Sequence, residues 1–303
     1  MNKSKLKKCL AVGIIMAFIA LPYGVCAQNS EQQYRVAACD WMMLKRQKLG
    51  EFQLAKDIKA DGVEIDMGPL GQRILFDNKL RDPHFQQLFR RTADSLGIAV
   101  PSIAMSGFFA QSFLKRENYK DLVQDCLNTM EVMGATVAFL PLGGSGHDWK
   151  QPGEARNEMV RRLHEVGEMA RQAGKVIAVR TQMDARANLL LLKEVDSQGI
   201  RIYYNLQDAV DQGLNACEEL KTLGTENIAQ IHASLTDSVT LDKDPRIDLH
   251  KVKSVLDKMK WRGWLVVERS RNAKDVRNVR GNFGTNVAYL KEVFKWRNNL
   301  IMQ

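Results

Sequence analysis

Short apolar runs recur along the chain and are separated by stretches with a helical pattern. Each run is nearly continuous rather than alternating, which is typical of parallel strands buried on both faces. The strands predicted in this way are Tyr34–Cys39, Gly62–Asp66, Ile98–Ile103, Thr136–Leu140, Lys175–Thr181, Ile200–Leu206, Ile228–Ser234 and Gly263–Arg269.

Apolar residues spaced three and four apart mark helices between these runs. The predicted helices are Pro83–Leu96, Tyr119–Met133, Glu154–Ala173, Ala185–Val195, Ala216–Leu223, Leu249–Met259 and Phe283–Trp296. A glycine follows several of them, as at Gly97 and Gly134, where a left-handed residue commonly ends a helix. Strands and helices that alternate through residues 28–303 predict one (β/α)8 TIM barrel, a fold that takes about 250 residues.

Residues 1–27 have the three parts of a secretory signal peptide: a lysine-rich start, an apolar stretch from Leu10 to Ala20, and small residues before Gln28. The apolar stretch is shorter than the ~20 residues that a membrane span needs. We therefore expect an exported, periplasmic or secreted protein with no stable membrane anchor after cleavage.

Charge and cysteine content refine this picture. Removal of the four lysines of the signal lowers the net charge from +9 to +5. No block of Lys and Arg is interleaved with aromatic residues, so nucleic acid is not an expected partner. Cys39, Cys126 and Cys217 remain in the mature chain, and we expect all three to be buried apolar residues.

The last four predicted strands each deliver one polar side chain near their carboxyl end. These residues are Arg180, Asn205, His232 and Glu268. In a (β/α)8 barrel such strand ends converge on one site. The arrangement resembles the xylose-isomerase-like TIM-barrel sugar phosphate isomerase/epimerase family, and the resemblance covers nearly the whole mature chain.

In that family the four strands supply Glu, Asp, His and Glu to one divalent metal, which stabilises an enediolate-like intermediate. The two glutamates also exchange a proton on opposite faces of one carbon. The resemblance implies metal ligands at His232, Glu268 and Asn205, with Mn, Mg or Zn as the metal, and a catalytic role for Glu268. Here, however, Arg180 replaces a glutamate and Asn205 replaces an aspartate.

The arginine changes the electrostatics of the predicted site. A guanidinium stays charged and neither binds a cation nor accepts a proton. It also repels a divalent ion strongly at a separation of a few ångströms. We therefore expect a metal that is weakly bound or absent, and an Arg180 side chain that pairs with Glu268, bidentately if the geometry allows.

Further candidates lie at the same end of the predicted barrel. The resemblance places Glu64, near the end of the second strand, close to the substrate. Trp41 is a candidate to stack on a sugar ring, with core packing as the alternative. Arg269 and Arg271 are candidates to bind an anionic sugar, and His147 is a candidate acid or base.

These observations favour an exported sugar isomerase/epimerase-like protein with a degenerate metal site, acting on a sugar or sugar derivative. The alternative is a non-catalytic carbohydrate-binding protein on the same barrel. An abasic-site endonuclease has the same barrel and also uses bound metal ions. Such an enzyme needs more His and carboxylate ligands than this chain provides, since the chain has five His in all.

Overall fold

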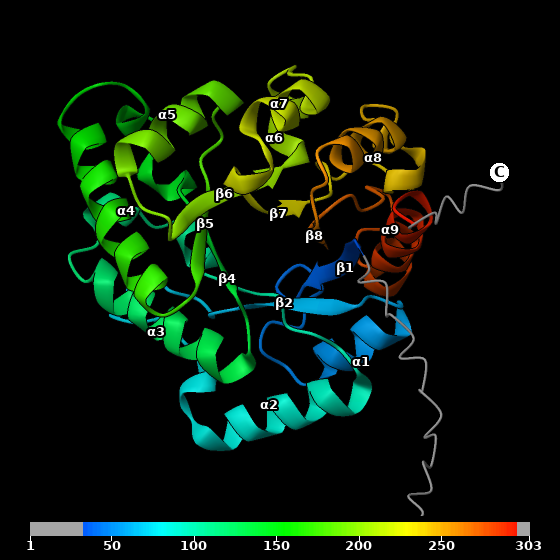
Figure 1. Ribbon diagram of the computed structural model, residues 1–303. Helices are drawn as coiled ribbons and strands as arrows, with labels where there is room; N and C mark the ends of the chain where they lie inside the picture. Colours follow the sequence, from blue (N-terminus) through cyan, green and yellow to red (C-terminus); the bar gives the residue numbers. More distant parts are fainter. Residues whose placement is uncertain (1–32, 296–303) are drawn as a thin grey trace, which may run out of the picture. The chain divides into compact units, whose positions relative to one another are not determined.

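Eight parallel strands form a closed barrel in a computed structural model that describes residues 33–295 (Figure 1). Each strand pairs with the next along the chain, and β1 pairs with β8 to close the ring. The fold predicted from the apolar runs is confirmed. The strands are β1 Tyr34–Cys39, β2 Gly62–Asp66, β3 Ser102–Ala104, β4 Val137–Pro141, β5 Val176–Arg180, β6 Ile200–Asn205, β7 Ile228–His232 and β8 Gly263–Val267.

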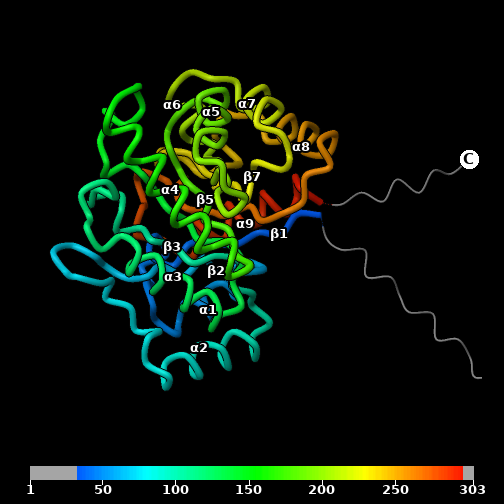
Figure 2. The backbone as a smooth tube through the Cα atoms, turned by 60° about the vertical axis from the view of Figure 1, so that its left-hand side comes forward, coloured from blue at the N-terminus to red at the C-terminus, as the bar shows by residue number. Residues whose placement is uncertain are grey.

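Helices surround the barrel and follow the strands in sequence. Both backbone views place α5–α8 on one side of the barrel and α1 and α2 on the opposite side (Figure 2). Within the described residues, no helix is long and apolar enough to cross a membrane. The helices are α1 Gly50–Asp57, α2 Pro83–Leu96, α3 Tyr119–Met133, α4 Glu154–Gln172, α5 Ala185–Val195, α6 Leu206–Asp211, α7 Ala216–Leu223, α8 Leu249–Lys258 and α9 Val279–Val293.

Several predicted boundaries were wrong, and two helices were not predicted. Strand β3 begins at Ser102 instead of Ile98, because Pro101 has no backbone N–H for the ladder. Helix α9 begins at Val279, since the side chain of Asn278 accepts a hydrogen bond from the Gly281 N–H and caps the helix there. The short helices α1 and α6 were missed, and α6 carries a residue of the candidate site.

Two apolar layers hold the fold together. A large core lies between the strands and the helices, and a small cluster fills the inside of the barrel. The inner cluster consists of Ala37, Cys39, Ala104, Val137, Phe139, Ala178, Tyr203 and Val266. The inside of the barrel is thus packed with side chains, and any ligand must approach it from an end.

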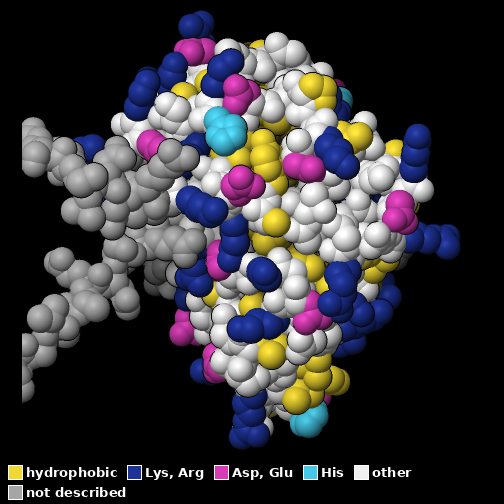
Figure 3. Space-filling model, turned by 90° about the vertical axis from the view of Figure 1, so that its right-hand side faces the viewer, with side chains coloured by type: hydrophobic (Ala, Val, Ile, Leu, Met, Phe, Trp, Pro, Cys, Tyr) yellow, Lys and Arg dark blue, Asp and Glu magenta, His cyan; other side chains and the backbone are white. Residues whose placement is uncertain are grey.

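The three cysteines of residues 33–295 differ in burial. Cys39 and Cys126 are buried and Cys217 is only partly buried, so the expectation of three buried cysteines was wrong for Cys217; all three are free thiols. On the face shown in Figure 3, basic and acidic side chains are interspersed, with small apolar groups between them. The predicted signal peptide, residues 1–27, lies outside the described residues.

Candidate functional site

The structure brings together the four polar side chains from the ends of β5 to β8. Arg180, Asn205 and His232 are the last residues of their strands, and Glu268 directly follows β8. Nη1 of Arg180 and Nδ1 of His232 each lie 3.6 Å from Oε2 of Glu268. Nδ2 of Asn205 lies 3.4 Å from Nδ1 of His232. Because alternate residues of a strand point to the same face, these side chains project into the carboxyl end of the barrel.

Arg180 pairs with Glu268 as predicted, at 3.6 Å, but its closer and bidentate partner is Asp208, which was not predicted. Nε and Nη2 of Arg180 donate to the two carboxylate oxygens of Asp208 at 2.9 and 2.6 Å. Both side chains are largely buried, with 7% and 14% of their surfaces exposed. Burial alone would lower the pKa of Arg180, but the Asp208 hydrogen bond and the charges of Glu268 and Asp208 raise it. The guanidinium is therefore fixed and charged.

Asp208 reaches Arg180 because a helix begins at the end of β6. Oδ1 of Asn205 accepts a hydrogen bond from the backbone N–H of Gln207 and caps α6. An asparagine in this position is among the best helix caps. Asp208 lies in the first turn of α6, where a carboxylate also interacts favourably with the helix dipole.

Glu268 carries a carboxylate oxygen without a partner. Its Oε2 is buried and accepts no hydrogen bond among the described residues, although Arg180 and His232 flank it. A buried acceptor left in this state costs free energy unless a ligand or water satisfies it. Arg180 Nη1, which makes no hydrogen bond within residues 33–295, faces the same oxygen. The two atoms form an ion pair at 3.6 Å, which is too long for a hydrogen bond, so each keeps its hydrogen-bonding capacity for a ligand.

A carboxylate from a distant strand of the barrel, that of Glu64, holds His232 in place. Oε1 of Glu64, on β2, lies 3.0 Å from Nε2 of His232, and both side chains are fully buried. Oε2 of Glu64 accepts hydrogen bonds from Ser102 Oγ at 2.7 Å and Tyr203 OH at 2.8 Å. Nε2 of His232 thus faces Glu64, and Nδ1 faces Asn205 and Glu268. Glu64 was predicted to bind substrate, but here it orients a histidine.

Aromatic rings cover the polar cluster. Trp41 is half-buried and stacks on Phe139, with centroids 6.3 Å apart and planes 7° apart. Its ring also meets His232 edge-on at 6.5 Å. Phe109, 37% exposed, lies under the guanidinium of Arg180 at 5.6 Å. Trp41 thus lies against the polar cluster with one face packed on Phe139, and its contact with a sugar stays a prediction.

The residues present do not fit the metal that the family resemblance implies. Asn205 uses its oxygen to cap α6, so it turns its NH2 group toward His232. Arg180 brings a fixed positive charge within 3.6 Å of the carboxylate oxygen that would bind the ion. Among residues 33–295, no group of three or more His, Cys, Asp or Glu side chains is placed to hold a metal.

The remaining predicted residues lie outside this cluster. Arg269 and Arg271 both pair with Asp237, at 3.3 and 2.5 Å, so one carboxylate already shares their charge. His147 is exposed in the loop between β4 and α4 and has no hydrogen bond or ion pair with the cluster in the described part of the chain. The geometry therefore gives neither group a direct link to Glu268.

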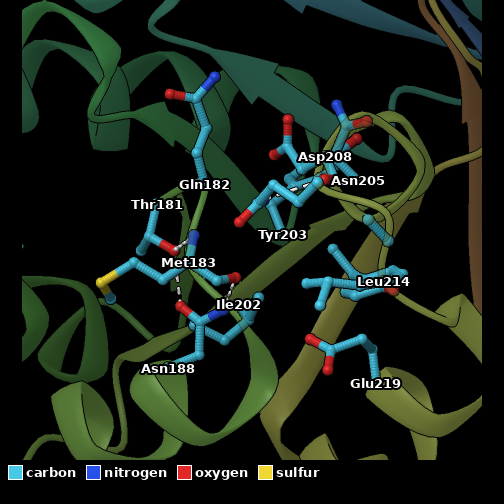
Figure 4. A pocket seen from close by; sticks show the side chains of 13 residues that line it. Thr181, Gln182, Met183, Asn188, Ile202, Tyr203, Asn205, Asp208, Leu214 and Glu219 are labelled. Carbon is cyan, nitrogen blue, oxygen red and sulfur yellow. Dashed lines mark hydrogen bonds between the residues drawn. The ribbon is translucent and has the colours of Figure 1, made fainter.

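A small pocket lies beside the cluster, between the ends of β5 and β6 and helices α5 to α7. Its volume is about 20 Å³, and Asp208, Asn205, Tyr203 and Glu219 are among its lining residues (Figure 4). A space of this size holds about one water molecule. The hydroxyl of Tyr204, which is buried and lacks a partner among the described residues, gives such a water an anchor.

Three buried carboxyl groups lie under the loops that follow β1 and β2. Asp40 accepts hydrogen bonds from the backbone N–H groups of Gln47 and Asp66, at 2.9 and 3.1 Å. Burial and the charge of the neighbouring Asp40 raise the pKa of Glu51 well above its usual range. Burial also raises the pKa of Asp66 to about 6, despite its ion pair with Arg46 at 2.8 Å. The hydrogen bonds that Asp40 accepts tie the loop that follows β1, which carries Trp41, to the end of β2.

This cluster predicts a pH dependence of stability. A carboxyl group with a raised folded-state pKa binds more protons when folded, so its stabilising effect is lost as pH rises from about 4 through about 6. For Asp66 the loss is about 3 kcal/mol. In Asp66→Asn this decline should be shallower than in the wild type, as measured by urea unfolding between pH 4 and 7. Equal slopes for the wild type and Asp66→Asn, with the exposed Asp77→Asn as control, would contradict the assignment.

Known proteins share this architecture. The family model described as xylose isomerase-like TIM barrel matches residues 52–293, more than half of the chain. A search of curated proteins finds no match.

Solved structures are similar at low sequence identity, which shows the fold alone. A xylose isomerase domain protein from Planctomyces limnophilus is 16% identical, with a TM-score of 0.64 over 86% of this chain and 96% of that one. A 3-keto-D-glucoside 4-epimerase from E. coli is 14% identical, with a TM-score of 0.65 over 86% and 99%. A sugar phosphate isomerase/epimerase from Parabacteroides distasonis is 10% identical, with a TM-score of 0.65 over 89% and 98%.

Proposed function

The chain belongs to the xylose isomerase-like TIM barrel family, and on that premise we propose that it is a sugar isomerase/epimerase-like enzyme. The substrate is a sugar or sugar derivative with a carbonyl group next to a carbon that bears hydrogen. Glu268 accepts the proton from that carbon. The aromatic surface of Trp41 covers the sugar.

One observation carries this proposal: Oε2 of Glu268 is buried, lacks a hydrogen-bond partner among the described residues, and lies at the carboxyl end of the barrel. A general base must have a free lone pair within reach of the substrate. The other carboxylates nearby are committed, Asp208 to Arg180 and Glu64 to His232, Ser102 and Tyr203. Glu268 is therefore the residue that the geometry favours as base.

The proposal predicts deuterium exchange. Aldoses and ketoses incubated with the protein in D2O should exchange the hydrogen next to the carbonyl, as followed by NMR. Glu268→Gln should slow this exchange by about 100-fold or more, since the amide cannot accept the proton. Glu219→Gln, which changes a half-buried glutamate outside the polar cluster, is the matched control and should retain exchange.

A carbohydrate-binding protein without catalysis is the second candidate. It is favoured by Arg180, which stands where the family resemblance implies a catalytic glutamate. Saturation-transfer NMR separates the two. Sugar binding without exchange would support the binding protein, whereas neither binding nor exchange with any aldose or ketose tested would contradict both.

Export is part of the proposal and rests on the signal-like sequence of residues 1–27. The protein should be recovered outside the cytoplasm with an amino terminus at or near Gln28, as determined by N-terminal sequencing of fractionated cells. Cytosolic protein that retains Met1 would contradict it.

The deuterium-exchange experiment also tests whether the sugar is neutral or anionic, if uronic acids and sugar phosphates are included among the substrates.

A further inference from the structure

Asp208 holds the guanidinium of Arg180 rigidly at the point where the substrate must develop negative charge. When a base removes the proton next to a carbonyl, the carbonyl oxygen becomes an oxyanion that needs a fixed donor or cation. Two N–H groups of Arg180 donate to Asp208, whereas Nη1 makes no hydrogen bond among the described residues and forms only a long ion pair with Oε2 of Glu268. Arg180 and Glu268 therefore present a donor, Nη1, and an acceptor, Oε2, that lie 3.6 Å apart.

This spacing suits an α-hydroxycarbonyl group, which places an acceptor and a hydroxyl donor on adjacent carbons. The carbonyl oxygen accepts from Nη1, and the hydroxyl group or the neighbouring C–H faces Oε2. Both carboxylate oxygens of Asp208 accept hydrogen bonds from Arg180, so Asp208 itself is not available to the substrate. It is a positioning residue, because its two hydrogen bonds fix the plane of the guanidinium and so direct Nη1 toward Glu268.

On the basis of the proposed function, we propose that the guanidinium of Arg180 is the cation that stabilises the oxyanion. The site then interconverts an aldose and a ketose with Glu268 as its single base. An inversion at one carbon requires a proton donor on the opposite face, and a guanidinium is too weak an acid for that task. Within the described residues of the cluster, Glu268 is the carboxylate with an uncommitted oxygen. The proton it removes must return from the same face.

The C–H bond next to the carbonyl breaks, its electron pair forms a C=C bond, and the carbonyl π pair becomes an oxyanion beside Nη1 of Arg180. The proton bonds to Oε2 of Glu268. That proton then returns to the former carbonyl carbon while the hydroxyl proton moves to the oxyanion, and the second carbon becomes the new carbonyl.

The test uses the full-length protein, with EDTA and with added Mn²⁺, and the aldoses and ketoses of the exchange experiment. We expect exchange to proceed in EDTA at the same rate as with Mn²⁺, and the product to be the aldose–ketose isomer. Arg180→Gln should slow exchange by about 100-fold or more, a typical loss for one oxyanion donor. Arg201→Gln, an exposed arginine of β6, is the matched control and should keep the wild-type rate.

Three results would overturn the inference while leaving the proposed function intact: exchange lost in EDTA, an epimer as the product, or full exchange by Arg180→Gln. The EDTA comparison and the product analysis need only the wild-type protein, so an Arg180 variant that fails to fold does not remove the test. Absence of both sugar binding and exchange in the wild type would instead contradict the proposed function itself.

Discussion

Replacing Asp208 with asparagine is expected to lower the free energy of unfolding by about 3 kcal/mol, at the lower end of the usual range for breaking a buried ion pair. The change leaves the guanidinium of Arg180, 7% exposed, without its bidentate carboxylate. Glu268, 3.6 Å from Nη1, still offsets part of the charge and keeps the loss from being larger. Urea unfolding followed by circular dichroism measures the effect.

Asp211→Asn is the matched control for this experiment. Asp211 lies on the same helix, α6, but is exposed, and its bonds to Gln207 and Thr236 are at the surface. Its replacement should change stability by less than about 0.5 kcal/mol. Equal, small effects for Asp208→Asn and Asp211→Asn would mean that water solvates Arg180 as well as the carboxylate does.

The second large effect is expected from rebuilding a metal site. The double variant Arg180→Glu with Asn205→Asp adds two carboxylates and removes one cation, so it should bind Mn²⁺ at least ~100-fold more tightly than the wild type. An aspartate at position 205 can still cap α6 with one oxygen and turn the other toward His232. Calorimetric titration of both proteins with Mn²⁺ gives the affinities.

The design of the double variant has to take the carboxylate of Asp208 into account. A new carboxylate at position 180 would face the two oxygens of Asp208 that now bind the guanidinium. Adding Asp208→Asn removes that repulsion and should restore stability, and Asp208→Asn alone is the control for metal binding. Tight stoichiometric Mn²⁺ binding by the unmodified protein would show that Arg180 turns away from the cluster and that the site takes a metal.

The sequence predicts the barrel well and the cluster only in part. The two-residue period of a strand predicts which side chains at its end point into the barrel. For this reason the sequence predicted that Arg180 and His232 lie in one site. Asp208 was missed because α6 is too short for a helical repeat. Its signal was the helix start itself, an Asn cap followed by an acid in the first turn. Sequence spacing also does not reveal contacts across the barrel, so Glu64 was expected beside the substrate instead of under His232.

The contact between Glu64 and His232 joins β2 to β7, residues 168 positions apart in the chain. Contacts of such long sequence separation form late, since the intervening chain must already be ordered. Neither half of the barrel contains both side chains, so a fragment that keeps its helices still lacks an oriented imidazole. The orientation of His232 therefore depends on closure of the whole ring and not on either half alone.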